Sequence, residues 1–362
     1  MKIQRPFVAM LLGFQTLAIG VAALAQPTPT VVETPRQMPV PRAKTSPVVD
    51  GKLDDTCWAQ SVWSEPFVDI GGNGKPRPPH QTRMKMLWDD KALYIAARLD
   101  EPHLQGTLRD HDSYIFQADN DLEVFIDPDG DCHDYGELEL NALGTTWDLL
   151  LTKPYRNGGR ALDSWEIKGL QVKTALEGTL NNPSDTDTAW TVEIAIPWRT
   201  FREIGGAEPP KLGDRWRINF SRVEWEWDEN GLKKGLYIKK PGKPESNWVW
   251  SPQGEVNMHL PERWGSMVFV GSDQGGKPLP EDPTALPRLW LGRFHQAWLA
   301  NPQADSRNPP NPISLPKGWF FSSLGKSQTG PNKSCVATLQ HTDGTMLSMD
   351  QDGRISVSQA PK

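Results

Sequence analysis

The segment Asp121-Leu122-Glu123-Val124-Phe125-Ile126-Asp127 has an aliphatic residue at every second position. Successive side chains of a β-strand point to opposite faces of the sheet, so the three aliphatic residues share one face. Glu123, Phe125 and Asp127 share the other face. The alternation stops at Pro128 and Gly130, which are residues typical of turns. This pattern predicts a strand with one apolar face directed at a core.

The same alternation recurs from residue 47 to residue 271, in short segments that stop at Gly, Pro, Asn or Asp. No helical period of useful length competes with it there, and no internal repeat of about 20–50 residues is visible. We therefore predict an all-β fold, an antiparallel β-sandwich, for residues 47–271. The predicted strands include Arg83–Trp88, Ala92–Leu99, Leu122–Asp127, Glu137–Ala142, Thr191–Pro197, Arg215–Glu226 and Ser266–Val270.

The strand faces that turn away from the predicted core carry many carboxylates, amides and indoles. The pleat predicts that Glu139, Asn141, Asn219 and Trp225 lie on one face of one sheet. Sugar rings stack their C–H faces on indoles, and sugar hydroxyls form hydrogen bonds with such polar groups. We therefore predict a carbohydrate-binding site on this face. Its predicted residues are Trp147, Trp225 and Trp227 for stacking, and Arg109, Glu139, Asn141 and Asn219 for orientation.

Each predicted stacking residue has an alternative role in the core, where most Trp side chains lie. Trp147 follows Gly144-Thr145-Thr146, which indicates an exposed loop position. Trp225 and Trp227 share their strand face with polar residues, which favours stacking over core packing. Trp is unusually frequent in this chain, with 16 residues against 11 Phe and 5 Tyr, so both roles stay open.

The charge balance limits the classes of partner. The 362 residues contain 39 Lys and Arg against 45 Asp and Glu, a formal net charge of −6. Nucleic acids and anionic membranes attract clustered Lys and Arg, so neither is expected as a main partner. Motifs of the forms Gly-x-Ser-x-Gly, His-Glu-x-x-His and Cys-x-x-Cys are absent from the sequence, and no catalytic residue is predicted.

The N-terminal residues have the features of a secretory signal. Lys2 and Arg5 precede an apolar run, and Ala23-Leu24-Ala25 provides a small-x-small cleavage pattern. Residues 1–25 are therefore predicted to be a signal peptide, with a secreted or periplasmic mature protein. Residues 26–46 are rich in Pro and are predicted to be an extended linker.

An acidic turn suggests a metal site. Asp127, Asp129 and Asp131 occupy alternate positions, like the first ligands of a calcium-binding loop. An EF-hand is excluded, because Cys132 and Leu138 stand where that loop needs Gly and Glu. A looser calcium site and a solvated acidic turn are the two interpretations of these residues.

Several blocks of sequence occur in the order expected for a known family. They are Asp50-Gly51-Lys52-Leu53-Asp54-Asp55, Trp88-Asp89-Asp90, residues 121–127, residues 190–198, residues 216–225, Asn247-Trp248-Val249-Trp250-Ser251-Pro252 and residues 259–265. Together these blocks resemble carbohydrate-binding module family 9 and its bacterial relatives. The resemblance implies an immunoglobulin-like or jelly-roll sandwich over 47–271, commonly stabilised by calcium, in a protein that handles polysaccharide.

Residues 272–362 are predicted to form a small α+β extension. Leu286, Trp290, Phe294 and Trp298 recur every four residues, which is typical of an amphipathic helix. Cys335–His341, Thr345–Asp350 and Arg354–Gln359 are joined at Asp-Gly turns and predict a three-stranded meander.

Three functions remain open on the sequence. The first is a secreted, non-catalytic protein of carbohydrate catabolism that binds poly- or oligosaccharide. The second is a glycan-degrading hydrolase that uses Glu123, Glu139 or Glu193 as acid or base. The third is a structural or interaction sandwich without sugar binding, in which the Trp residues serve the core.

Overall fold

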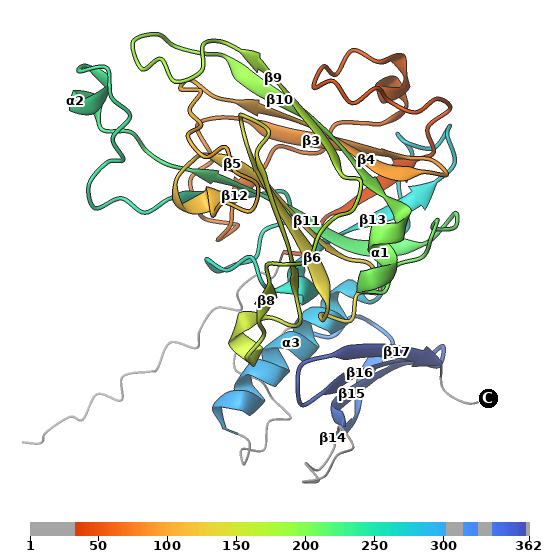
Figure 1. Ribbon diagram of the computed structural model, residues 1–362. Helices are drawn as coiled ribbons and strands as arrows, with labels where there is room; N and C mark the ends of the chain where they lie inside the picture. Colours follow the sequence, from red (N-terminus) through yellow and green to blue (C-terminus); the bar gives the residue numbers. More distant parts are fainter. Residues whose placement is uncertain (1–32, 302–313, 325–334, 360–362) are drawn as a thin grey trace, which may run out of the picture. The chain divides into compact units, whose positions relative to one another are not determined.

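The computed structural model describes residues 33–301, 314–324 and 335–359. They form three sheets, and most of their strands are labelled in Figure 1. A nine-stranded sheet has the order β1-β13-β11-β5-β6-β7-β8, and β12 pairs with both β11 and β2. Its strands are β1 Gln37–Pro41, β2 Val68–Asp69, β5 Asp121–Asp127, β6 Tyr135–Asn141, β7 Thr146–Leu151, β8 Ala161–Leu162, β11 Arg215–Glu224, β12 Ser246–Val249 and β13 Gly265–Val270.

A second sheet has the order β3-β4-β10-β9 and forms the other layer of a sandwich (Figure 1). Its strands are β3 Thr82–Trp88, β4 Ala92–Asp100, β9 Gln171–Glu177 and β10 Ala189–Pro197. The helices of the described residues are short, apart from α3. They are η1 Thr56–Gln60, η2 Ile115–Gln117, η3 Tyr155–Asn157, α1 Trp198–Phe201, η4 Arg202–Ile204, α2 Glu229–Leu232, η5 Pro261–Arg263 and α3 Ala285–Ala300.

The main core lies between these two sheets. Val124 and Ile218 come from the nine-stranded sheet and pack with Ile95 and Ile194 from the four-stranded sheet. All four are almost completely buried. The predicted apolar faces are therefore the faces that pack, and the predicted all-β sandwich is confirmed.

The surplus of Trp is largely explained by the core. Trp88, Trp198 and Trp216 form a chain of edge-to-face contacts, with ring centroids 6.4 and 5.9 Å apart. Trp216 also meets Phe269, at 4.9 Å. Aromatic pairs in this arrangement add stability beyond the area that they bury. Most of the indoles therefore act as structural packing groups.

The predicted linker over 26–46 is wrong for its second half. Residues 37–41 form β1, which pairs in parallel with β13 from Gln37 opposite Ser266 to Pro41 opposite Val270. Met38 and Val40 are buried in the main core. A strand can contain Pro at the edge of a sheet, where its missing N–H removes no ladder bond, and β1 is such an edge strand. The predicted signal peptide, residues 1–25, lies outside the described residues.

The C-terminal residues have a second hydrophobic cluster of their own. The predicted helix is α3, and its Trp290 and Phe294 pack with Leu339 and Leu347. The predicted three-stranded meander is corrected to four strands, because Trp319 begins an additional strand. The strands of this sheet, in the order β14-β15-β16-β17, are Trp319–Leu324, Cys335–His341, Thr345–Asp350 and Ile355–Gln359. Among the described residues, no helix is both long and apolar enough to cross a membrane.

Candidate functional site

The candidate site lies on the outer face of the nine-stranded sheet, around β5, β6 and β7. In the antiparallel register, Glu123 lies opposite Glu139, and Glu139 lies opposite Trp147 on the next strand. On its other side Glu123 lies opposite Ser221 of β11. Residues that are directly opposite each other point to the same face. A row of polar groups therefore crosses the three neighbouring strands β11, β5 and β6, and Trp147 of β7 continues it.

The register confirms the predicted shared face for three of the four residues. Glu139 and Asn141 of β6 and Asn219 of β11 all point away from the main core, since Glu139 pairs with Glu123 and Asn219 with Phe125. Trp225 lies just beyond the end of β11. Its backbone N–H donates to the side-chain oxygen of Asn120, at 2.8 Å.

Four carboxyl groups of this face are buried close together: Asp121, Glu123, Glu137 and Glu139. Asp121, Glu123 and Glu139 have side-chain oxygens within 4.8 Å of one another. Burial raises the pKa of Glu123 to about 7, while the Ser221 hydroxyl opposes that rise. Burial, followed by repulsion from neighbouring carboxylates, holds the pKa values of Asp121, Glu137 and Glu139 well above their ordinary range. The cluster is therefore able to keep carboxyl groups protonated near neutral pH.

The Glu137 carboxyl forms no hydrogen bond to any residue that the structure describes. The side chain is buried, and burial followed by the charge of Glu123 raises its pKa. Glu139 by contrast accepts a hydrogen bond from the Phe116 N–H at 3.3 Å. Buried polar groups are usually hydrogen bonded, and an exception requires an explanation. The Glu137 carboxyl therefore keeps its hydrogen-bonding capacity for a ligand.

Asn141 and Asn219 were predicted to contact sugar, but their side chains form hydrogen bonds within the protein. The Asn141 amide donates to Leu108 O and to Asp119, at 2.9 and 2.8 Å, and its oxygen accepts from two backbone N–H groups. The Asn219 amide donates to Ser251 O at 2.8 Å, and its oxygen accepts the Ser251 N–H. Both side chains are completely buried. The structure therefore contradicts their prediction as sugar-contacting residues.

The prediction of Trp147 as an exposed platform is also wrong. Trp147 belongs to β7 rather than to a loop, and only 5% of it is exposed. Tyr114 lies over its ring at a centroid distance of 4.4 Å, and Phe116 stacks at 6.5 Å. Trp147 packs in a hydrophobic cluster on the outer face, together with Phe125 and other residues. Trp147 therefore packs beneath the exposed Tyr114 and is not itself exposed.

Trp225 and Trp227 differ in accessibility. Trp227 is buried against Tyr237, with ring centroids 5.0 Å apart, so its prediction as a stacking platform is wrong. Trp225 is half-buried; its indole N–H donates to Phe116 O at 3.0 Å. The Lys239 ammonium lies 3.2 Å from the Trp225 ring centroid, which is a cation–π contact. One face of the Trp225 ring is therefore already occupied.

Two tyrosines that the sequence did not single out are the exposed aromatics near the carboxyl cluster. Tyr114 is 53% exposed and Tyr155 is 50% exposed. Burial and then the charge of Glu137 raise the pKa of Tyr155 to about 12, with Asp163, Glu139 and Tyr114 contributing less. Tyr155 also packs edge-on against His259, at 4.6 Å. The predicted Arg109 is exposed in the same loop as Tyr114.

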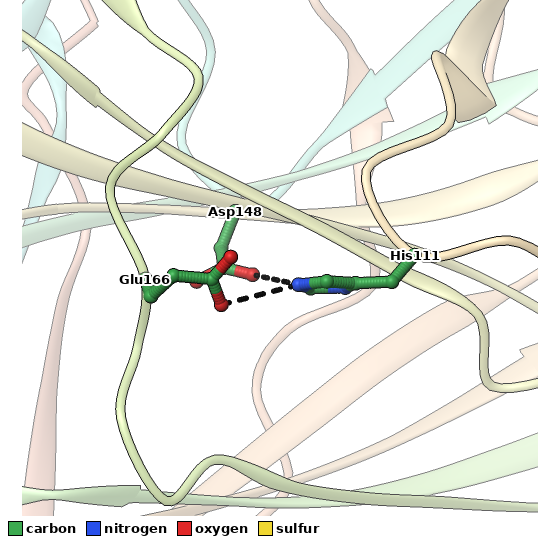
Figure 2. Close-up of side chains that lie close together, drawn as sticks. All are labelled: His111, Asp148 and Glu166. Carbon is green, nitrogen blue, oxygen red and sulfur yellow. Dashed lines mark hydrogen bonds and ion pairs between the residues drawn. The ribbon is translucent and has the colours of Figure 1, made fainter.

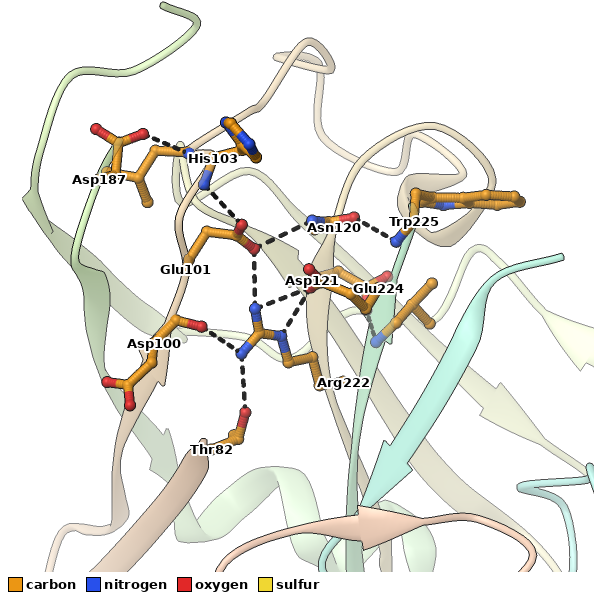
Figure 3. A network of polar contacts seen from close by, with 12 residues as sticks. Thr82, Asp100, Glu101, His103, Asn120, Asp121, Asp187, Arg222, Glu224 and Trp225 are labelled. Carbon is orange, nitrogen blue, oxygen red and sulfur yellow. Dashed lines mark hydrogen bonds and ion pairs between the residues drawn. The ribbon is translucent and has the colours of Figure 1, made fainter. Parts of the chain in front are cut away.

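A buried arginine holds the loops around this site in place (Figure 3). Arg222 donates to Glu101 at 2.8 Å, to Glu224 at 3.0 Å and to Thr82 at 3.1 Å. Glu101 in turn accepts a hydrogen bond from Asn120, the residue that fixes the Trp225 backbone. Paired and fully hydrogen-bonded charges of this kind are costly to break. The network therefore ties the loop after β4 to the end of β11.

Glu193, the third carboxylate considered for catalysis, lies on a different sheet. It belongs to β10 and is buried, and it accepts the Trp58 indole N–H at 2.7 Å and the Asp50 and Gly51 N–H groups at 3.0 Å. These contacts fasten the Asp-Gly turn at residues 50–51 to the four-stranded sheet. Glu193 is therefore a structural residue and cannot act together with Glu123 or Glu139.

The predicted calcium ligands come together at the end of β5. Asp127, Asp129 and Asp131 have side-chain oxygens within 4.8 Å of one another, so the three could hold a cation. Asp127 also accepts N–H groups from Gly130 and Cys132, at 3.0 and 2.9 Å. Asp131 forms an ion pair with Arg354. A bound cation would compete with that guanidinium.

Comparisons with known proteins identify related sequences. An exoglucanase XynX of Acetivibrio thermocellus is 26% identical over 193 residues, which are 53% of this chain and 14% of the relative. An endo-1,4-β-xylanase A of Thermoanaerobacterium saccharolyticum is 28% identical over 197 residues, or 53% of this chain and 13% of the relative. The matched region is thus a small part of each relative.

Solved structures and a family profile also match the chain. A carbohydrate binding module family 9 from Caldicellulosiruptor kristjanssonii, in complex with cellotriose, is 18% identical with a TM-score of 0.42, over 68% of this chain and 100% of that one. A carbohydrate binding module family 9 from the same organism, in complex with glucose, is 19% identical with a TM-score of 0.43, over 67% of this chain and 100% of that one. The profile described as carbohydrate family 9 binding domain-like matches residues 49–272, more than half of the chain. The chain therefore belongs to the carbohydrate family 9 binding domain-like family.

Proposed function

We propose that this is a secreted, non-catalytic protein of carbohydrate catabolism that binds poly- or oligosaccharide on the outer face of the nine-stranded sheet. The observation that carries the proposal is the buried carboxyl of Glu137, without a hydrogen bond among the described residues, together with the half-exposed ring of Tyr155, whose pKa the charge of Glu137 raises. A sugar offers both a hydroxyl for the carboxyl and an apolar C–H face for the ring. Membership of the family supports the same chemistry.

The proposed contacts revise the stacking residues. Tyr114 and Tyr155 supply the exposed rings, the half-buried Trp225 contributes the part of its ring that Lys239 does not cover, and Arg109 is an exposed donor. Covering a ring face contributes on the order of 2 kcal/mol at about 25 cal/mol per Å². Hydroxyl hydrogen bonds largely exchange with water and add about 0.5–1.5 kcal/mol each. The rings therefore supply most of the affinity, and the carboxyls supply orientation.

A hydrolase is the second candidate, because Glu123 and Glu139 have side-chain oxygens within 4.8 Å of each other. Retaining glycosidases place their two carboxyl groups about 5–5.5 Å apart. One of the pair must be ionised to act as nucleophile, whereas burial raises the pKa of Glu123 to about 7 and holds that of Glu139 well above its ordinary range. The high pKa values favour binding over catalysis at neutral pH.

The experiment is a calorimetric titration of the purified protein with cellotriose and with xylo-oligosaccharides, ligands suggested by the names of the relatives and of the solved structures. Tyr155→Ala and Tyr114→Ala should each weaken binding about tenfold or more, since about 1.4 kcal/mol is one factor of ten. Tyr155→Phe should keep most of the affinity. Phe320→Ala, an exposed aromatic of β14, is the matched control and should bind normally.

Three results would contradict the proposal. Unchanged affinity in both Tyr→Ala variants would exclude the rings as the platform. Release of new reducing ends by wild-type protein but not by Glu123→Gln would favour the hydrolase. Absence of binding to any tested glycan would favour a structural sandwich. Separately, mass spectrometry of protein from a secreting host should find Gln26 as the first residue.

A further inference from the structure

Three segments that are far apart in sequence bring polar side chains together near β7, away from the carboxyl cluster. His111 comes from the loop between β4 and β5, Asp148 from β7, and Glu166 from the loop after β8. Figure 2 shows the imidazole pointing at both carboxylates. His111 Nε2 lies 3.7 Å from Asp148 Oδ1 and 3.2 Å from Glu166 Oε2. Asp112 Oδ1 is 3.4 Å from the same nitrogen.

The other ring nitrogen of His111 is oriented by the backbone. Nδ1 lies 3.0 Å from Thr146 O, a carbonyl that can only accept, so Nδ1 carries the proton. In the neutral ring, Nε2 then presents its lone pair to the carboxylates. Metal-binding His residues typically donate their second N–H to a backbone carbonyl or a carboxylate in this way. The imidazole is thus held in the tautomer that binds a metal.

The buried carboxylate is the independent observation. Asp148 is 1% exposed, and its Oδ2 accepts the Ile167 N–H. Its Oδ1, which faces His111, is buried and has no hydrogen-bond partner in the part of the chain that the structure describes. The same holds for Asp112 Oδ1. Asp112 Oδ1 and Asp148 Oδ1 therefore have no hydrogen-bond partner among the described residues, and both lie within ion-pair distance of His111 Nε2, where a cation would bind.

The charges and spacing fit a divalent transition metal. Among the described residues, no Lys or Arg forms an ion pair with Asp112, Asp148 or Glu166; their ion pairs are those with His111. Zinc binds nitrogen and oxygen ligands at about 2.0–2.2 Å in a tetrahedron, which separates neighbouring ligands by about 3.3–3.6 Å. The three separations from Nε2, 3.2 to 3.7 Å, agree with this geometry. A nitrogen ligand also favours zinc over calcium, which takes oxygen ligands.

We propose that His111, Asp112, Asp148 and Glu166 form a binding site for Zn²⁺ or a similar divalent transition metal. The ion would join the loop that carries Tyr114 to β7 and to the loop after β8. Glu166 and His111 are about half-exposed, so the ion can enter from solvent. Because the unfolded chain does not bring these groups together, the ion would stabilise the folded protein.

The test is a calorimetric titration of untagged, EDTA-treated, dialysed full-length protein with ZnCl2, followed by thermal unfolding with and without the ion. We expect one saturable site and a higher melting temperature. His111→Gln and Glu166→Gln should each lose affinity by at least the 10–100-fold known for changes around metal sites. His341→Gln is the matched control, because His341 pairs with a single carboxylate, Asp343, at 3.0 Å.

Glu166 has His111 as its side-chain partner among the described residues, so Glu166→Gln should fold normally even if His111→Gln does not. Failure of the wild-type protein to bind Zn²⁺ would overturn the proposal and leave an ion pair of protonated His111. Equal affinity in wild type and Glu166→Gln would also overturn it, by placing the ion elsewhere, for example at the buried thiols of Cys57 or Cys132. CaCl2 in place of ZnCl2 should give weaker binding at this site.

Discussion

Strand β5 carries two acidic clusters that differ in how their charges are balanced. At its end, Asp127 accepts two backbone N–H groups, Asp131 pairs with Arg354, and Arg288 donates to Gly130 O. Around its middle, the Glu123 carboxyl lies close to those of Asp121 and Glu139, and the nearby Glu137 carboxyl of β6 has no hydrogen bond among the described residues. The first arrangement is typical of a structural turn. The second leaves polar groups that a ligand could satisfy, so burial alone does not distinguish structure from function.

The largest change in stability is expected from a substitution in the acidic cluster at the end of β5, which consists of Asp127, Asp129 and Asp131. Asp127→Ala removes the acceptor of the Gly130 and Cys132 N–H groups and leaves both donors buried. Each buried donor without a partner costs about 1–3 kcal/mol, so the free energy of unfolding should fall by about 4 kcal/mol. Urea unfolding measures it. A loss below about 1 kcal/mol would mean that the turn does not depend on this carboxylate.

A smaller change, this time a gain in stability, is expected from replacing Glu123. Its pKa is about 7 in the folded protein against an ordinary value of 4.5, so the folded state binds more protons between those two pH values. Stability should therefore fall as pH rises from about 4.5 to about 7, by up to about 3 kcal/mol at 1.36 kcal/mol per pKa unit. Glu123→Gln should remove this part of the pH dependence and be more stable than wild type at pH 8.

Unfolding curves of wild type and Glu123→Gln at pH 4, 6 and 8 provide the measurement. Glu177→Gln is a suitable control, because Glu177 is exposed and paired with Arg98, which lowers the pKa of its carboxyl. A Glu123→Gln variant with the same pH profile as wild type would show that Glu123 titrates normally.

The smallest change in stability is expected from calcium binding to Asp127, Asp129 and Asp131. The fold family suggests a stabilising calcium, and Asp127, Asp129 and Asp131 are close enough to hold one, but Arg354 already pairs with Asp131. We expect CaCl2 to raise the melting temperature by a few degrees, through binding to the folded state. Differential scanning fluorimetry with CaCl2 and with EDTA measures this, and Asp129→Asn should abolish the shift. An equal shift in Asp129→Asn would place the ion at another position.

The sandwich could be predicted because alternation is a local property of each strand. Leu122, Val124 and Ile126 identify the core face of β5 without any knowledge of its neighbours. Strand β1 could not be predicted in this way. Its prolines are tolerated only because it lies at a sheet edge, and its partner β13 is more than 200 residues away in the sequence.

The site residues were harder to predict because the outer face is covered as well. Phe125, Trp147 and Trp264 form a hydrophobic cluster there, under loops whose course the alternation does not indicate. The alternation correctly placed Asn141 and Asn219 on this face. It could not show that both amides form hydrogen bonds with the backbone of neighbouring loops. Tyr114 and Tyr155 lie outside the strands and carried no periodic signal.

The His111 cluster illustrates the same limit. His111, Asp148 and Glu166 are separated by 37 and 18 residues, and no motif spacing links them. Only the pairing of β6 with β7 and the paths of two loops bring the three together. Residues of this kind become visible through unpartnered buried atoms, such as Asp148 Oδ1, and not through sequence pattern.

Backbone amide NMR during a cellotriose titration locates the sugar-binding face of the sandwich. If the outer face of the nine-stranded sheet binds sugar, the chemical-shift changes should saturate and should centre on Glu137, Tyr114 and Tyr155. The amides of β3, β4 and β10 should stay unchanged, because those strands belong to the other sheet. Shifts centred on β3, β4, β9 and β10, or on the C-terminal strands β14–β17, would show that sugar binds elsewhere.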